Sequence, residues 1–144
     1  MLVHQILKSK GDDVVVTVKP GTKVAEAARL LADRRIGTVV ISENGTTADG
    51  ILSERDIVRE LANRGGGCLD DNVDAYMTTE LVTCGRGDSA DAVLSKMTQG
   101  RFRHMPVIEN GTMVGLITLG DVVKARLSEL AMEKDALEGM IMGH

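Results

Sequence analysis

Two short stretches of the chain place a carboxylate three residues after a hydroxyl group. The stretches are GILSERDIV at residues 50–58 and GLITLGDVV at residues 115–123. Each is typical of a buried strand that runs into a helix. A hydroxyl beside the free N–H groups of a helix start suits a phosphate, and a carboxylate in the first turn can accept hydrogen bonds from both hydroxyls of a ribose. The pattern indicates nucleoside phosphate binding by Ser53 with Asp56, and by Thr118 with Asp121.

The same four residues also fit a purely structural role. A Ser or Thr at a helix start, followed three residues later by an acid, can form a capping box in which each side chain binds the other residue's backbone N–H. Under that hypothesis the two pairs only stabilise helix starts. The recurrence of the pair does not decide the matter, because structural features are duplicated as well.

The pair recurs because the chain is an internal duplication. An offset of 66 residues aligns Thr17 with Thr83, and the turn ENG at 43–45 with ENG at 109–111. After those turns the offset falls to 65. Self-similarity at a nearly fixed offset is the signature of a repeated structural unit.

Each copy predicts a β-α-β-β-α unit. The expected strands lie at residues 14–18, 38–42 and 50–53 in the first copy, and at 81–84, 104–108 and 113–118 in the second. Apolar residues at helical spacing predict one helix after the first strand and another after the third. Because each helix has one apolar face, the copies should pack sheet to sheet, in an α+β fold with pseudo-two-fold symmetry.

The duplication divides the chain into four expected parts. These are a first repeat with an N-terminal lead-in segment (1–64), a glycine-rich linker (65–72), a second repeat (73–127) and a C-terminal helical extension (128–144). Three consecutive glycines in the linker should impose little stiffness. The extension has heptad-like apolar spacing over only two repeats of the pattern, which favours packing on its own module or on a second chain.

Composition excludes several classes of protein. The net charge of −4 and the presence of only two aromatic residues argue against a nucleic-acid surface. No apolar run approaches a membrane span and the first 13 residues lack the apolar segment of a secretory signal, so we expect a cytoplasmic protein with no membrane association. Cys68 and Cys84 form no CxxC pair, and no metal site is predicted.

The two copies resemble the CBS domain, named after cystathionine β-synthase. The resemblance rests on RRIGTVVISENGTTADGILSERDIV and GRFRHMPVIENGTMVGLITLGDVV, and it extends over about residues 3–127. Paired CBS motifs form a Bateman module, and the chain is similar to the small stand-alone two-CBS proteins of bacteria. The resemblance implies a flat homodimer and a sensor of adenosine-containing ligands. It implies that Asp56 and Asp121 bind ribose, and that Ser53 and Thr118 bind phosphate.

The resemblance also implies that the copies differ in how they hold phosphate. Arg101, Arg103 and His104 stand at positions whose counterparts often contact phosphate in the family, whereas the first copy has Gly37 and Thr38 in place of Arg103 and His104. The second copy is therefore expected to form the more strongly basic site. Partial burial as a structural histidine is the alternative for His104, and solvated surface charge is the alternative for Arg103.

Three further residues are candidates for the ligand site. Arg55 belongs to the first copy only, and its alternative is also a solvated surface charge. Thr17 and Thr83 open equivalent strands at a position that the family often uses near the nucleotide. Their alternative is a plain strand-forming role, since β-branched residues favour strands.

The sequence therefore favours a regulatory module for signal transduction. Its expected ligand is AMP, ATP or NAD, bound as a regulator and not as a required cofactor. The alternative is a structural homodimeric scaffold, or a partner-binding module, whose pockets are vestigial. No nucleophile–base pair, metal cluster or glycine-rich phosphate loop is visible, so we expect no enzymatic activity. The sequence identifies neither the nucleotide nor a protein partner.

Overall fold

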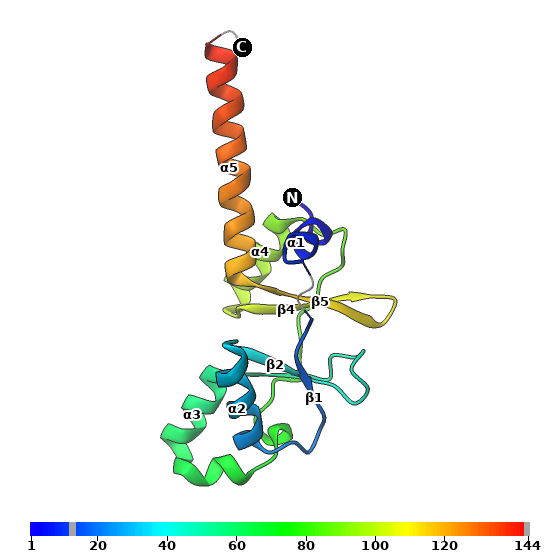
Figure 1. The fold of residues 1–144 in the computed structure, drawn as a ribbon, viewed down its shortest axis with the longest axis vertical. Helices are drawn as coiled ribbons and strands as arrows, with labels where there is room; N and C mark the ends of the chain where they lie inside the picture. Colours follow the sequence, from blue (N-terminus) through cyan, green and yellow to red (C-terminus); the bar gives the residue numbers. More distant parts are fainter. Residues whose placement is uncertain (12–13, 143–144) are drawn as a thin grey trace.

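Two small sheets face each other across the middle of the molecule, and the helices cover their outer sides (Figure 1). The computed structural model describes residues 1–11 and 14–142. The first repeat contains β1 (Thr17–Val18), α2 (Val24–Arg34), β2 (Thr38–Ile41), β3 (Gly50–Ser53) and α3 (Glu54–Arg64). The second contains α4 (Ala90–Gly100), β4 (His104–Glu109), β5 (Thr112–Thr118) and α5 (Leu119–Ile141). Outside these units lie α1 (Val3–Ser9) and the 3₁₀ helices η1 (Gly65–Asp70) and η2 (Val73–Ala75).

Strand β2 is buried along its whole length because each of its faces meets a different apolar layer. Val39 and Ile41 pack with the apolar faces of α2 and α3. Val40, between them, packs against residues of the other sheet, including Met113. Successive strand residues point to opposite sides, so a continuous apolar run is what a doubly covered strand needs. This pattern confirms the predicted α+β fold of two repeats packed sheet to sheet.

The two sheets are not equally complete. In the first repeat β1 pairs in parallel with β2, which pairs antiparallel with β3. In the second repeat β4 pairs antiparallel with β5. The strand predicted at residues 81–84 is reduced to a single parallel bridge between Cys84 and Val107. The backbone hydrogen bonds between this segment and β4 are those that Cys84 makes with Pro106 and Ile108, which is too little ladder for a strand.

The segment that precedes each repeat packs on the other repeat. Helix α1 contributes Val3 and Ile6 to the core formed by α4, β4, β5 and α5. Correspondingly, Val73 of η2 belongs to the core of the first repeat. Two equivalent hydrogen bonds fix this exchange, from Val3 N–H to the Asp88 carbonyl (2.8 Å) and from Val73 N–H to the Thr22 carbonyl (2.8 Å).

The expectation that residues 1–64 form a first repeat with its own lead-in segment is therefore wrong for that segment. The order of the segments along the chain does not show against which core the lead-in segment packs. In Figure 1, α1 lies beside the second repeat, whereas β1 lies in the sheet of the first repeat.

The glycine-rich segment also differs from the prediction. It is not a flexible linker, since Gly65–Asp70 form the 3₁₀ helix η1, which contacts α2 and α3 and buries Cys68 completely. The predicted C-terminal extension is continuous with α5, which projects beyond the second repeat (Figure 1). The last two residues of the predicted extension, 143–144, lie outside the described residues. Among residues 1–11 and 14–142, no helix is both long and apolar enough to cross a membrane.

The exchanged position of α1 predicts a specific loss of stability. Ile6 is 2% exposed in the core of the second repeat, whereas His4 on the same helix is exposed. Ile6→Ala should lower the free energy of unfolding by about 2 to 4 kcal/mol, because it leaves a cavity in a packed core. His4→Ala should change it by less than about 0.5 kcal/mol. Urea denaturation measures both, and equal effects of the two substitutions would contradict this placement of α1.

Candidate functional site

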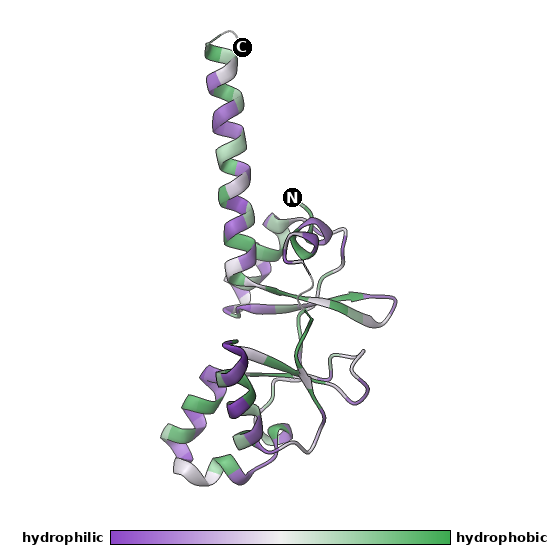
Figure 2. Ribbon diagram, in the orientation of Figure 1, coloured by the Kyte–Doolittle hydropathy of each residue, from purple (hydrophilic) through white to green (hydrophobic). Residues whose placement is uncertain are grey.

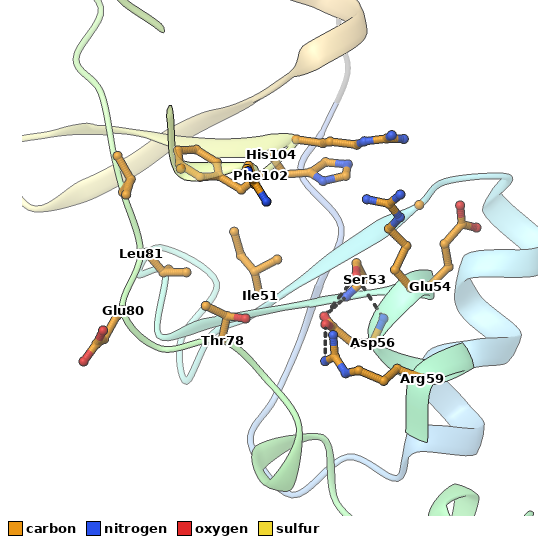
Figure 3. A pocket seen from close by; sticks show the side chains of 16 residues that line it. Ile51, Ser53, Glu54, Asp56, Arg59, Thr78, Glu80, Leu81, Phe102 and His104 are labelled. Carbon is orange, nitrogen blue, oxygen red and sulfur yellow. Dashed lines mark hydrogen bonds and ion pairs between the residues drawn. The ribbon is translucent and has the colours of Figure 1, made fainter. Parts of the chain in front are cut away.

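A cavity of about 530 Å³ lies between the repeats beside the start of α3, and we call it the Asp56 cavity (Figure 3). Its first-repeat wall comes from the end of β3 and the first turns of α3. The opposite wall comes from the start of β4 and from the extended chain before Cys84. It is lined by Gly37, Ile51, Ser53, Glu54, Arg55, Asp56, Arg59, Thr78, Glu80, Leu81, Val82, Gly100, Arg101, Phe102, Arg103 and His104.

Ser53 and Asp56 form a capping box at the start of α3. The Ser53 hydroxyl accepts from the Asp56 N–H (3.2 Å), and Asp56 Oδ2 accepts from the N–H (2.8 Å) and the hydroxyl (3.0 Å) of Ser53. The other carboxylate oxygen, Oδ1, accepts from the largely exposed Arg59 (2.8 Å). The capping box, which was the alternative to a binding role, is therefore formed. The carboxylate of Asp56 nevertheless lies on the wall of the cavity (Figure 3).

The basic residues of the second repeat lie over the motif of the first. Helix α4 ends at Gly100, and Arg101 adopts the left-handed conformation (φ 56°), which redirects the chain into β4. Arg101 and Arg103 therefore line the Asp56 cavity, together with Arg55 of α3. Among the described residues, the arginines that form ion pairs are Arg59, Arg64 and Arg126. The three arginines just placed on the cavity wall therefore have no paired carboxylate there.

The expected location of the more basic site is therefore wrong. Arg103 was expected to serve the site of its own repeat, that of Thr118 and Asp121. Because the sheets pack face to face, the start of β4 instead faces the end of β3. The guanidinium groups of Arg55, Arg101 and Arg103 therefore line the cavity that contains Asp56.

A second cavity, of about 400 Å³, occupies the pseudo-symmetric position beside the start of α5, and we call it the Asp121 cavity. Thr118 and Asp121 form the same capping box, with Asp121 Oδ2 accepting from the Thr118 N–H at 2.9 Å. Burial raises the pKa of Asp121, but the Thr118 N–H and the Lys10 ammonium outweigh it and hold that pKa below its ordinary value. The lining residues are Leu7, Lys10, Gly11, Val14, Val15, Val16, Ile36, Gly37, Thr38, His104, Val114, Gly115, Leu116, Thr118 and Asp121.

His104 lines both cavities and lies where the repeats meet. Its Nδ1 is 3.1 Å from the hydroxyl of Thr38, the residue 66 positions earlier that is its counterpart in the first repeat. Burial lowers the pKa of His104, and the neighbouring positive charge of Arg103 lowers it further. A neutral ring is therefore favoured at the centre of the repeat pair.

Thr17 and Thr83 do not line either cavity. Thr17 pairs with Val40 in β1, and Thr83 is exposed, so their location agrees with the strand-forming alternative for Thr17. Sequence reasoning missed the apolar walls, Ile51 with Leu81 and Val82. Their counterparts in the Asp121 cavity are Leu116, Val15 and Val16, so the repeat offset itself was the signal that could have found them.

Within the described residues, no cluster of three or more histidine, cysteine or acidic side chains could hold a metal ion. Cys68 and Cys84 are both free and buried. Burial raises the pKa of Cys84 to about 11, so its thiol stays protonated at neutral pH. The chemistry of the cavities is thus that of hydroxyl, carboxylate and guanidinium groups around apolar walls.

The CBS-domain family model matches residues 12–63 and 73–128, which together are most of the chain. The chain belongs to the CBS-domain family. The resemblance noted in the sequence is thereby confirmed. The solved structure of a CBS-domain containing protein from Agrobacterium tumefaciens is 43% identical, with a TM-score of 0.83 over 88% of this chain and 99% of that one. A CBS domain protein from Pyrobaculum aerophilum, solved in complex with AMP, is 26% identical, with a TM-score of 0.76 over 92% of this chain and 99% of that one.

Among curated relatives the coverage varies widely. An uncharacterised 17.7 kDa protein of Acidianus ambivalens is 32% identical over 132 residues, which are 91% of this chain and 76% of the relative. The CBS domain-containing protein CBSCBSPB2 of Arabidopsis thaliana is 32% identical over 125 residues, but these are only 23% of that protein. The similarity to the plant protein therefore concerns the CBS pair alone.

The buried His104 predicts a pH dependence of stability. A histidine whose pKa is lower in the folded state binds its proton first in the unfolded state, so stability falls as the pH drops below the ordinary value near 6.5. We expect the free energy of unfolding to decrease between pH 7.5 and 5.5, and His104→Gln to remove part of that decrease. Urea denaturation across this range measures it. A decrease that His104→Gln leaves unchanged would show that His104 stays solvated.

Proposed function

We propose that this chain is a regulatory module that binds an adenine nucleotide in the Asp56 cavity, between its two CBS repeats. The observation that carries the proposal is that Asp56 of the first repeat and Arg103 of the second, which pairs with no carboxylate among the described residues, line the same cavity. A carboxylate suited to a ribose and guanidinium groups suited to a phosphate therefore face the same space.

The remaining walls suit the base of a nucleotide. Ile51, Leu81 and Phe102 supply apolar surface on the side of the cavity away from Arg59 (Figure 3), and Val82 also lines the cavity. Pockets that bind small molecules are mostly apolar, with a few polar groups that fix the orientation of the ligand. The related protein solved in complex with AMP supports an adenine nucleotide as that ligand.

A regulatory role follows from the place of the cavity. Because the ligand would contact both repeats, it would favour the relative orientation in which both walls contact it, and it shifts that equilibrium by its difference in affinity for the two states. In this proposal the nucleotide is a regulator and not a resident cofactor, and the module catalyses no reaction. Its proposed location is the cytoplasm.

The nucleotide proposal predicts a ligand-dependent gain in stability that needs Asp56. AMP at about a hundred times its Kd should add about 2.7 kcal/mol, because it binds only the folded state. That corresponds to about 5 to 10 °C in melting temperature for a domain of this size. Asp56→Asn should abolish most of the shift by removing a charged acceptor. Differential scanning fluorimetry with and without AMP measures it.

Two matched controls separate the parts of the site. Glu26→Gln removes an exposed carboxylate in the first turn of α2, and it should leave the AMP shift intact. Arg103→Met should weaken AMP but not adenosine, which has no phosphate, whereas Arg29→Met on the exposed side of α2 should affect neither. Equal shifts in the wild type and in Asp56→Asn would rule out the assignment. No shift with any adenine nucleotide would favour the scaffold alternative.

We propose in addition that the module is a homodimer joined through its helices. Val58 of α3 and its counterpart Val123 of α5 are 63% and 41% exposed, on the outer sides of the two repeats. Apolar residues are also visible on the outer helices in Figure 2. Adjacent apolar surface of this kind is typical of an interface with another chain.

The dimer proposal predicts a mass near twice the 15.4 kDa of one chain in light scattering. Val58→Glu should shift the molecule towards the monomer, because a buried unpaired charge at an interface is costly. Lys19→Glu, on an exposed loop, should leave the mass unchanged. A monomer at millimolar concentration would contradict the proposal.

A further inference from the structure

The two cavities differ in the residue that the preceding segment brings to the carboxylate. Lys10 follows α1 and reaches the Asp121 cavity, where its ammonium donates to Asp121 Oδ2 at 2.9 Å and to the Leu116 carbonyl at 3.0 Å. Because Val3 corresponds to Val73, the position that corresponds to Lys10 is that of Glu80, an acid that lines the Asp56 cavity. No lysine is among the described residues that line the Asp56 cavity.

The backbone of the first repeat does without such a lysine. The carbonyl of Ile51, which is the counterpart of Leu116, accepts from the Thr78 N–H at 2.8 Å. In the second repeat the Lys10 ammonium is the donor to the equivalent carbonyl. Lys10 thus replaces a backbone N–H as the donor to this carbonyl, and it also pairs with the carboxylate of Asp121.

The two carboxylates are held with different strength. Asp56 is 13% exposed, but its partner Arg59 is 58% exposed, so water and a ligand compete easily for the guanidinium. Lys10 and Asp121 are 20% and 21% exposed, and the lysine has a second acceptor in the protein. A partly buried pair with two hydrogen bonds is exchanged for a ligand at a much greater cost.

The Asp121 cavity also lacks the groups that would repay that cost. The positions of Arg103 and Arg55 are taken by Gly37 and Gly120 in the second site. Its described ionisable lining residues are Lys10, Asp121 and the partly buried His104. No unpaired guanidinium among the described residues is left there to draw in a phosphate.

We propose that Lys10 is a specificity-determining residue that closes the Asp121 cavity to adenine nucleotides, so that each chain binds a single one, at Asp56. The ammonium neutralises the charge of Asp121 and occupies Oδ2, one of the two carboxylate oxygens that the hydroxyls of a ribose could bind. This inference rests on the proposed nucleotide function, and it makes the two pseudo-symmetric cavities unequal.

Isothermal titration of the full chain with AMP tests the proposal. The wild type should bind one AMP per chain, and Asp56→Asn should lose it. Lys10→Met, which keeps the length of the side chain without its charge, should bind two, because the second site gains about tenfold or more in affinity. The additional Asp121→Asn change should return Lys10→Met to one site. Lys8→Met, on the exposed side of the same helix, should bind one.

The outcomes separate the two proposals. Two sites in the wild type, one of them lost in Asp121→Asn, would overturn the role of Lys10 while leaving nucleotide binding intact. One site in both Lys10→Met and Lys10→Gln would do the same, and the second variant guards against a folding defect in the first. No binding to any of these proteins would overturn the nucleotide function, and the inference about Lys10 with it.

Discussion

The contact between the two sheets is the constraint on which the rest of this molecule depends. Neither a three-stranded nor a two-stranded sheet of such short strands has enough surface to be stable alone. Each needs helices on one face and the other sheet on the opposite face. The layer between them is formed by Val40 and Ile51 of the first repeat and Met113 of the second. The cavities lie at the edges of that layer because the sheets are too small to fill the space between the helix starts.

The exchange of the lead-in segments strengthens the same contact. Helix α1 packs on the core of the second repeat and precedes β1 of the first, and η2 packs on the core of the first repeat and precedes the bridge of Cys84 to the second. Separating the repeats would therefore break the packing of α1 and η2 as well as the layer between the sheets. Two units of this size, which would be marginal alone, become one cooperative body by this route.

Sequence reasoning reached some of these features because they depend on local spacing. The strand–helix junctions at Ser53 and Thr118 were predictable, since a capping box and a strand run are patterns of adjacent residues. The repeat offset also identified Thr38 and His104 as counterparts, and in the structure these two side chains lie in contact at the centre of the repeat pair.

What could not be predicted depends on which distant segments meet. Lys10 and Asp121 are 111 residues apart, and no motif surrounds the lysine. Arg103 could be recognised as a candidate for phosphate binding. That it lines the cavity beside the motif of the opposite repeat follows only from the packing of the sheets. The glycines of η1 were expected to be flexible, because their packing against α2 and α3 is a tertiary effect that their low helical propensity does not show.

Helix α5 begins at the Thr118 cap, on the wall of one cavity, and continues for 23 residues without a break. At 1.5 Å per residue it is about 35 Å long, and its outer half projects beyond the second repeat (Figure 1). The helix is therefore a rigid arm whose pivot is at the cavity. A tilt of about 5° at the cap displaces its far end by about 3 Å, by the geometry of a rod of that length. A change too small to detect at the cap becomes, at the far end, a displacement as large as the diameter of a water molecule.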